Sequence, residues 1–237
     1  MRKITKILLF AVLAIPFLQS CNSKFEQADK AVLVTVQKSL DPAGFYGILD
    51  SGEKLYPGSM RVAYTPSKDI QRAIIYFSEL EEPREGYAYN ADVFNVAEVE
   101  TQRITQVISP QADTLVNGLQ INNAWIGGGF INVEFSVNID RLSTKSLSVA
   151  LQEMMIDGRA ELDEEGYFPL TLGFKCYPAL ENGMGTTIST MASFYLGNGY
   201  SMDELGCKGY KITYNGLNSY LGEEKKTLIV KPQANNQ

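Results

Sequence analysis

The 237-residue sequence contains no histidine. This absence excludes the Ser-His-Asp and Cys-His catalytic arrangements and every metal site built on imidazole. It also removes the side chain whose ordinary pKa suits acid–base chemistry near neutral pH. Mechanisms that use carboxylates alone remain compatible with the composition, and a glycosidase would need two of them roughly 5–10 Å apart in a cleft.

The acidic residues are grouped in polar segments between apolar runs, where solvated loop charge is the ordinary interpretation. These groups lie at residues 79–85, 163–165, 203–204 and 223–224. The segment from Asp157 to Glu165 has carboxylates for calcium, but its spacing is not that of an EF-hand. We therefore expect no catalytic residue, no metal site and no cofactor.

Positive charge is also scarce, since 21 Lys and Arg stand against 27 Asp and Glu, for a net charge of −6. Nucleic-acid binding depends on clustered Lys and Arg, and so does electrostatic attraction to anionic lipid. The composition therefore predicts that nucleic acid is not a partner. Apolar residues make up 45% of the chain, which suits packed cores and argues against disorder.

The chain has one extended apolar run near its start, residues 7–18, preceded by Arg2, Lys3 and Lys6 and followed by Ser20-Cys21. This run is too short for a membrane-spanning helix, which needs about 20 apolar residues. The layout is typical of a secretory signal peptide (residues 1–20), and its Ser-Cys ending predicts a lipobox with lipid on Cys21. An ordinary signal peptide with a chance cysteine is the alternative.

Acyl chains on Cys21 would hold the protein to a membrane. We expect an outer-membrane lipoprotein, without deciding between its periplasmic and surface faces. Removal of residues 1–20 leaves 217 residues with a net charge of −9, and this length predicts two domains. Residues 21–29 would form a tether, residues 30–109 the first domain and residues 113–237 the second.

Short runs typical of β-strands fill the first domain, separated by turn signals such as Asp50-Ser51-Gly52 and Pro57-Gly58. The runs lie at residues 31–36, 45–49, 54–56, 61–65, 73–77 and 93–99. Several short strands in about 75 residues predict a small barrel or sandwich.

The second domain has the clearest alternation, with apolar side chains at every second position from Ile131 to Ile139. Further strands are predicted at residues 147–151, 170–177, 188–196, 210–214 and 227–230. Two packed antiparallel sheets would bury their apolar faces. The run Gly127-Gly128-Gly129 lacks the Lys and following helix of a phosphate loop, and predicts a hairpin before Phe130.

Several of these segments together resemble the NigD-like lipoproteins. Residues 46–57 (YGILDSGEKLYP) and 61–64 (RVAY) resemble the family's first domain, and residues 125–135 (WIGGGFINVEF) its entry to the second. Residues 210–214 (YKITY) and 226–230 (KTLIV) are similar to its closing strands. The resemblance implies an all-β protein with an N-terminal OB-like barrel and a C-terminal antiparallel β-sandwich. The family has no catalytic residues to carry over.

Two cysteines remain after Cys21. Cys176 shares the apolar phase of a predicted strand, whereas Cys207 lies in a glycine-rich connection. An exported compartment permits a disulfide between them, and two separate buried thiols fit the sequence equally well. Asp113-Thr114-Leu115 matches an O-glycosylation pattern of the lineage that such lipoproteins resemble, so Thr114 is a candidate acceptor.

Aromatic residues are the candidate ligand contacts. Trp125 is the single tryptophan, and it would anchor the sandwich core or offer an exposed platform for a sugar ring. Tyr87, Tyr89 and Tyr200 lie near predicted loops, where tyrosines suit carbohydrate or protein contact. The more conservative interpretation is packing, with the hydroxyl at a wet edge.

These observations favour a non-catalytic, lipid-anchored cell-envelope protein with a binding or interaction role. Its partners would be the membrane, through the lipid, and a carbohydrate or an envelope protein. A carboxylate-dependent glycosidase is the first alternative. A bacteriocin-related or immunity lipoprotein is the second, and it rests on the family resemblance alone.

Overall fold

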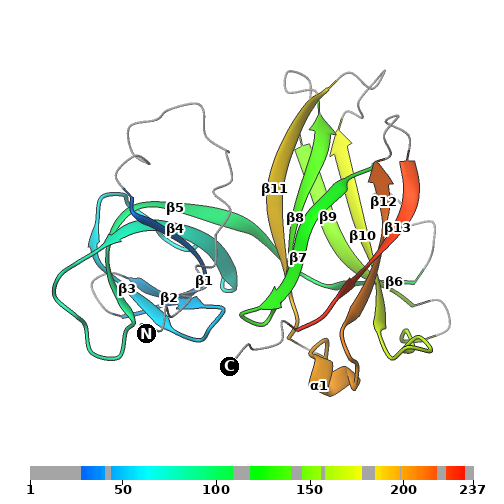
Figure 1. Ribbon diagram of the computed structural model, residues 1–237, viewed down its shortest axis with the longest axis horizontal. Coiled ribbons are helices and arrows are strands. Elements are labelled where there is room, and N and C mark those ends of the chain that lie inside the picture. Colours follow the sequence, from blue (N-terminus) through cyan, green and yellow to red (C-terminus); the bar gives the residue numbers. More distant parts are fainter. Residues whose placement is uncertain are drawn as a thin grey trace, which may run out of the picture. The chain divides into compact units, whose positions relative to one another are not determined.

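The computed structural model describes residues 28–40, 44–108, 118–139, 146–155, 158–177, 185–197, 199–217 and 223–232. These residues form β structure almost throughout, which confirms the predicted class (Figure 1). They divide into two compact units. The first comprises described residues up to Leu49, Glu53–Asp69 and Ala73–Glu98, and the second comprises Asp50–Gly52, Ile70–Arg72 and the chain from Val99 onward.

The first unit is a five-stranded barrel. Its strands are β1 (Lys30–Lys38), β2 (Phe45–Leu49), β3 (Lys54–Met60), β4 (Gln71–Glu79) and the N-terminal part of β5 (Tyr89–Arg103). They are ordered β3-β2-β1-β4-β5, and a parallel pairing of β3 with β5 closes the ring. This order is that of the OB fold, so the predicted OB-like barrel is confirmed.

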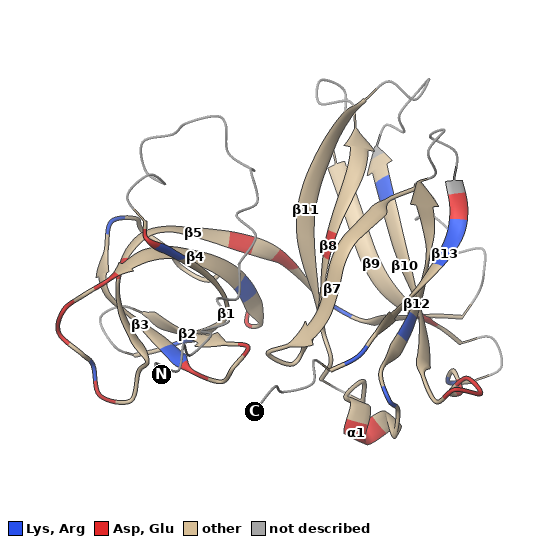
Figure 2. Cartoon of the chain, in the orientation of Figure 1, with Lys and Arg blue, Asp and Glu red and all other residues tan. Residues whose placement is uncertain are grey.

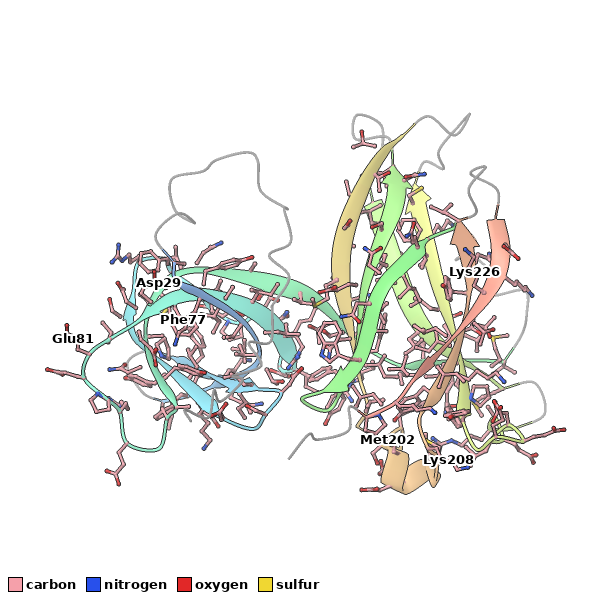
Figure 3. All side chains as sticks on the ribbon, in the orientation of Figure 1. Asp29, Phe77, Glu81, Met202, Lys208 and Lys226 are labelled. Carbon is pink, nitrogen blue, oxygen red and sulfur yellow. The ribbon has the colours of Figure 1, made fainter. Side chains whose placement is uncertain are left out.

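Apolar residues alternate into the barrel, as the period of two along a strand requires. Ala73, Ile75 and Phe77 of β4 are fully buried, and Figure 3 shows Phe77 inside the ring of strands. The same core contains Val34, Val36, Phe45, Leu55, Ala91 and Val93.

Two details of this unit differ from the prediction. Pro57-Gly58 does not end β3, because a register shift between Pro57 and Ser59 lets the strand continue to Met60. Residues 61–65 form no strand. They belong to the loop between β3 and β4, which is tied to Glu98 of β5. The Glu98 carboxylate accepts hydrogen bonds from the Tyr64 hydroxyl (3.1 Å) and from the Ser67 hydroxyl (2.8 Å).

The second unit is a sandwich of two sheets. One sheet has the order β5-β11-β8-β7 and the other β13-β12-β10-β9-β6. The strands are β6 (Thr105–Val107), β7 (Gln120–Gly127), β8 (Phe130–Ile139), β9 (Ser146–Met154), β10 (Phe168–Tyr177), β11 (Thr186–Tyr195), β12 (Tyr210–Leu217) and β13 (Glu223–Val230). Their inward residues form one core that includes the alternating set from Ile131 to Ile139. The predicted sandwich is confirmed.

The sandwich is mixed rather than purely antiparallel. The pairs β5–β11, β6–β9 and β10–β12 are parallel. Alternation of apolar residues marks a strand but says nothing of its direction, because parallel and antiparallel strands share the same period.

A two-residue turn joins β7 to β8, which confirms the predicted hairpin. Gly127 pairs with Phe130, and the turn residues Gly128 and Gly129 have φ of 60° and 83°. Both central residues of a type I′ turn require positive φ, which explains the glycine pair.

One helical turn, α1 (Met202–Leu205), was not predicted. Ser201 and Glu204 form a capping box and Gly206 ends the turn in the left-handed conformation. The Ser-x-x-Glu spacing is the signal that could have revealed it. In the described part of the chain, no helix has the length and apolar character needed to cross a bilayer.

Candidate functional site

Three tyrosines gather on the outer surface of the barrel. In β2 and β3, Phe45 and Leu55 face the core, so the neighbouring Tyr46 and Tyr56 face outward. Tyr87 comes from the loop between β4 and β5. Its ring lies 6.1 Å from the ring of Tyr46 in an edge-on arrangement and 5.2 Å from that of Tyr56. We call Tyr46, Tyr56 and Tyr87 the tyrosine cluster.

Two cations border the tyrosine cluster. The guanidinium carbon of Arg84 lies 3.9 Å from the centre of the Tyr56 ring, and the Lys54 ammonium lies 5.5 Å from that of Tyr46. Tyr56 is 8% exposed beneath these neighbours, whereas Tyr46 and Tyr87 are half-buried and Lys54 and Arg84 are exposed. The surface therefore offers the partly exposed rings of Tyr46 and Tyr87 beside hydrogen-bond donors, with Tyr56 packed beneath them.

Backbone hydrogen bonds fix the loop that carries Tyr87. The Ala88 N–H donates to the Lys54 carbonyl (2.8 Å), and the Tyr87 N–H donates to the Arg84 carbonyl (3.1 Å). Asn90 ties the same loop to β5 by donating to the Glu82 carbonyl (2.7 Å). Figure 3 shows the side chain of Glu81, in the same loop, pointing outward, and Figure 2 marks the acidic and basic positions of the loop. The tyrosine cluster is thus held in place before any ligand arrives.

A second cluster, in the second unit, centres on Asp50. Its carboxylate accepts from the Arg72 guanidinium (2.6 Å) and from the Trp125 indole N–H (3.1 Å). Arg72 is fully buried, and its guanidinium also lies 5.1 Å from the Phe130 ring. Burial lowers the pKa of Arg72, while the Asp50 charge and hydrogen bond oppose that shift. Arginine stays charged in proteins, so this is a structural ion pair.

The buried Glu153 carboxylate is the centre of a third cluster. It accepts from the Tyr200 hydroxyl (2.6 Å), the Ala160 N–H (2.9 Å) and the Gln106 amide (3.3 Å), with Arg159 3.7 Å away. Burial raises the pKa of Tyr200 to about 12, and the hydrogen bond to Glu153 adds to the shift. These contacts hold loops to the sandwich and leave the carboxylate enclosed by protein groups.

The predicted contact aromatics separate in the structure. Tyr87 alone belongs to the tyrosine cluster. Tyr89 packs edge-on against the core residue Phe77 at 5.6 Å, and Tyr200 is 6% exposed with its hydroxyl on Glu153. Trp125 is half-buried, and its neighbours Ala124 and Ile126 pack on the sandwich core while its indole binds Asp50.

Tyr46 and Tyr56 were missed as site residues because the sequence places them inside strands. The signal that could have found them is their phase, opposite to that of Phe45 and Leu55.

The structure separates the two cysteines. No disulfide joins Cys176 and Cys207, both of which are described residues. Phe168, at the start of β10, donates to the Gly209 carbonyl (3.0 Å), so Cys207 lies near that end. Cys176 lies eight residues further along β10, roughly 26 Å away at strand rise. A disulfide needs Cα atoms within about 7 Å, so separate thiols are the alternative that this fold adopts.

Cys21 and Thr114, the predicted lipidation and glycosylation sites, lie outside the described residues. So do residues 1–20 and nearly all of the predicted tether, as well as the boundary at residues 109–113. These assignments remain predictions.

Acidic residues that the sequence grouped in loops have structural roles where their contacts are described. Asp163 accepts from the Tyr167 N–H (2.9 Å) and the Lys211 ammonium (2.9 Å), and Glu204 caps α1. Among the described residues, no three Cys, Asp or Glu side chains are arranged to hold a metal ion.

The fold defines a class: a two-unit, all-β protein in which an OB barrel precedes a β-sandwich. Residues 33–99 match the model of the NigD-like N-terminal OB domain. The chain therefore carries a NigD-like N-terminal OB domain, and the resemblance seen in its sequence is supported.

Solved structures extend the likeness over most of the chain. A protein of unknown function from Bacteroides vulgatus is 26% identical, with a TM-score of 0.69 over 87% of this chain and 92% of its own. A NigD-like immunity protein from Bacteroides caccae is 18% identical, with a TM-score of 0.58 over 83% and 91%. A candidate lipoprotein from Bacteroides fragilis is 8% identical, with a TM-score of 0.57 over 87% and 99%.

The similarities to the Bacteroides caccae and Bacteroides fragilis structures show a shared fold. A search of the curated proteins finds no match to the sequence. The matched family and these three structures are not named as enzymes.

Proposed function

We propose that the protein is a non-catalytic, lipid-anchored envelope protein that binds an oligosaccharide on the tyrosine cluster. The observation that carries this proposal is the outward-facing group of Tyr46, Tyr56 and Tyr87 on the β2–β3 face beside the β4–β5 loop. In OB folds this face and this loop bind oligosaccharides or oligonucleotides. A net charge of −6 disfavours the oligonucleotide.

The chemistry of the cluster suits a sugar. Tyrosine offers an apolar ring together with a hydroxyl, so one side chain can pack on a sugar ring and form a hydrogen bond to it. Lys54 and Arg84 add donors at the edge of the same surface. Because the β4–β5 loop is already tied to β3, little conformational freedom would be lost on binding.

The proposal of a lipid anchor is based on the Ser20-Cys21 ending of the predicted signal peptide. The likeness in fold to a candidate lipoprotein of Bacteroides fragilis is compatible with it. Immunity is not part of the proposal, because the likeness to the Bacteroides caccae immunity protein is one of fold.

The test is affinity electrophoresis of the full chain through gels containing starch, xylan, mannan, pectin or hyaluronan. We expect at least one polysaccharide to retard the protein and Tyr87→Ala to weaken the affinity about tenfold, the loss of about 1.4 kcal/mol. Tyr76→Ala is the matched control, because Tyr76 lies on β4, outside the cluster, and is also half-buried.

Retardation by none of the polysaccharides, or equal retardation of a Tyr46→Ala/Tyr87→Ala double variant, contradicts the proposal. A parallel assay for new reducing ends addresses the glycosidase alternative. Turnover that disappears in carboxylate variants would replace the binding role with an enzymatic one.

A further inference from the structure

The sandwich contains a cleft between its two sheets, with a volume of about 290 Å³. Its floor consists of Phe135 and Val137 from one sheet and Val149 and Phe174 from the other. These four side chains are 8% exposed or less, because they belong to the core of the unit. The cleft is therefore an apolar opening between the sheets rather than a surface depression.

Polar side chains stand at the edge of this cleft. Glu100 and Gln102 of β5 pair with Ala192 and Phe194, which face the core, so both polar residues lie on the inner side of their sheet. Gln102 donates to the Glu100 carboxylate (3.1 Å). Thr190, opposite Phe135, is also inward-facing yet exposed, and Leu147 on the facing strand is 45% exposed.

This placement breaks the ordinary pattern of a sandwich, in which inward positions are apolar and covered. Glu100 and Thr190 occupy inward positions that contact solvent, next to side chains that are almost fully buried. Apolar walls with a few convergent polar groups are the usual composition of a small-molecule site.

We propose that the cleft binds one medium-length aliphatic chain that ends in a hydrogen-bond donor, an ammonium or a hydroxyl. Glu100 is the one ionisable side chain among the residues that line the cleft, so its carboxylate favours a donor head and repels an anionic one. An apolar cavity of about 150 Å³ holds benzene, so this volume suits on the order of ten heavy atoms. The site is separate from the tyrosine cluster and does not depend on the function proposed for it.

The test uses the purified full chain with decylamine, 1-decanol and decanoate as probes, measured by titration calorimetry. We expect saturable binding of decylamine and decanol, with decanoate at least about tenfold weaker at neutral pH. Methyl NMR locates the binding, because Val149 lines the cleft as part of the sandwich core whereas Val34 lies in the core of the barrel. The Val149 methyl signals should shift and the Val34 signals should not.

Two substitutions sharpen the test. Thr190→Phe places a ring at the edge of the cleft and should abolish binding, while Thr187→Phe, on the same strand but in the opposite phase, should leave it intact. Glu100→Gln keeps the shape and removes the charge, so it should weaken decylamine about tenfold and change decanol less than about twofold. Because Glu100 is exposed, this variant tests the proposal even if Thr190→Phe fails to fold.

Absence of saturable binding by decylamine and decanol overturns the proposal. So does decanoate binding as tightly as decylamine, or decylamine binding unchanged by Glu100→Gln. Binding that persists in a folded Thr190→Phe protein, with unmoved Val149 methyl signals, places the probes elsewhere and also overturns it.

Discussion

The Asp50 carboxylate lies 2.6 Å from the guanidinium of Arg72, whose side chain is 0% exposed. The turn that supplies Asp50 was recognisable in the sequence as a turn signal, but its partner was not. A buried guanidinium needs a nearby carboxylate, because an uncompensated charge is expensive to keep out of water.

Asp50→Ala should therefore destabilise the second unit by about 3 kcal/mol, the lower end of the range for breaking a buried pair, since Asp50 is itself 29% exposed. Urea denaturation followed by the fluorescence of Trp125, the single tryptophan, measures the effect close to its source. Asp69→Ala is the control, because the pair of Asp69 with Lys38 is solvent-exposed. Equal midpoints for Asp50→Ala and the unchanged protein would contradict the structural role of this pair.

Gly128→Ala should cost more stability than Gly129→Ala. Both residues have positive φ, so alanine at either position costs about 1–2 kcal/mol. Only at position 128 would the new Cβ meet other atoms, 2.5 Å from an Arg72 nitrogen and 2.7 Å from an Asp50 oxygen. Thermal denaturation of the two variants gives the comparison, and a larger loss for Gly129→Ala would show that the ion pair does not constrain the hairpin.

Alkaline pH should weaken the protein partly through Tyr200. Burial raises the pKa of Tyr200 to about 12, above the ordinary value of 10.0, and the hydrogen bond to Glu153 contributes. A raised pKa means that the stabilisation is complete below pH 10 and is lost as the pH rises towards 12. Tyr200→Phe should lower stability at pH 8 by about 1–3 kcal/mol, because Glu153 loses a buried partner.

The difference in unfolding free energy between the unchanged protein and Tyr200→Phe should then shrink between pH 10 and 12. Urea titrations at pH 8, 10 and 11 measure it. A difference that stays constant across this range would mean that the Tyr200 hydroxyl titrates normally.

Cys21→Ala should release the protein from membranes into the soluble fraction. Two or more acyl chains hold a protein stably where one does not, so loss of the acylated residue removes the anchor. Fractionation of cells that express the full chain is the measurement, with Cys207→Ala as the control. Continued membrane association of Cys21→Ala would contradict the predicted lipobox.

The alternation of apolar residues predicted most of the strands, because one buried face imposes a period of two wherever a strand covers a core. It identified residues 131–139 and 73–77 almost as the structure has them. It could not give strand direction, and it missed β7, whose exposed Asn122 and Asn123 break the pattern. Strand direction and the presence of β7 both depend on which strands pair in the folded protein.

The candidate sites were harder to predict than the fold. Tyr87 was identified from its position near a loop, but Tyr46 joins it only because β2 and β3 are neighbours in the barrel. The Asp50–Trp125 hydrogen bond joins residues 75 positions apart. Local composition carries no signal for such contacts, since they depend on how the strands are ordered.

β5 runs without interruption for 15 residues, pairing with β3 near its start and with β11 near its end. The alternation of its side chains between two faces therefore continues without a break from the barrel to the edge of the cleft. Insertion of a single amino acid between Phe94 and Val99 would invert every later side chain of the strand and turn Glu100 and Gln102 to the opposite surface. The side chains of β5 can therefore be exchanged one at a time, whereas a change of one residue in its length reverses the two faces of everything beyond the change.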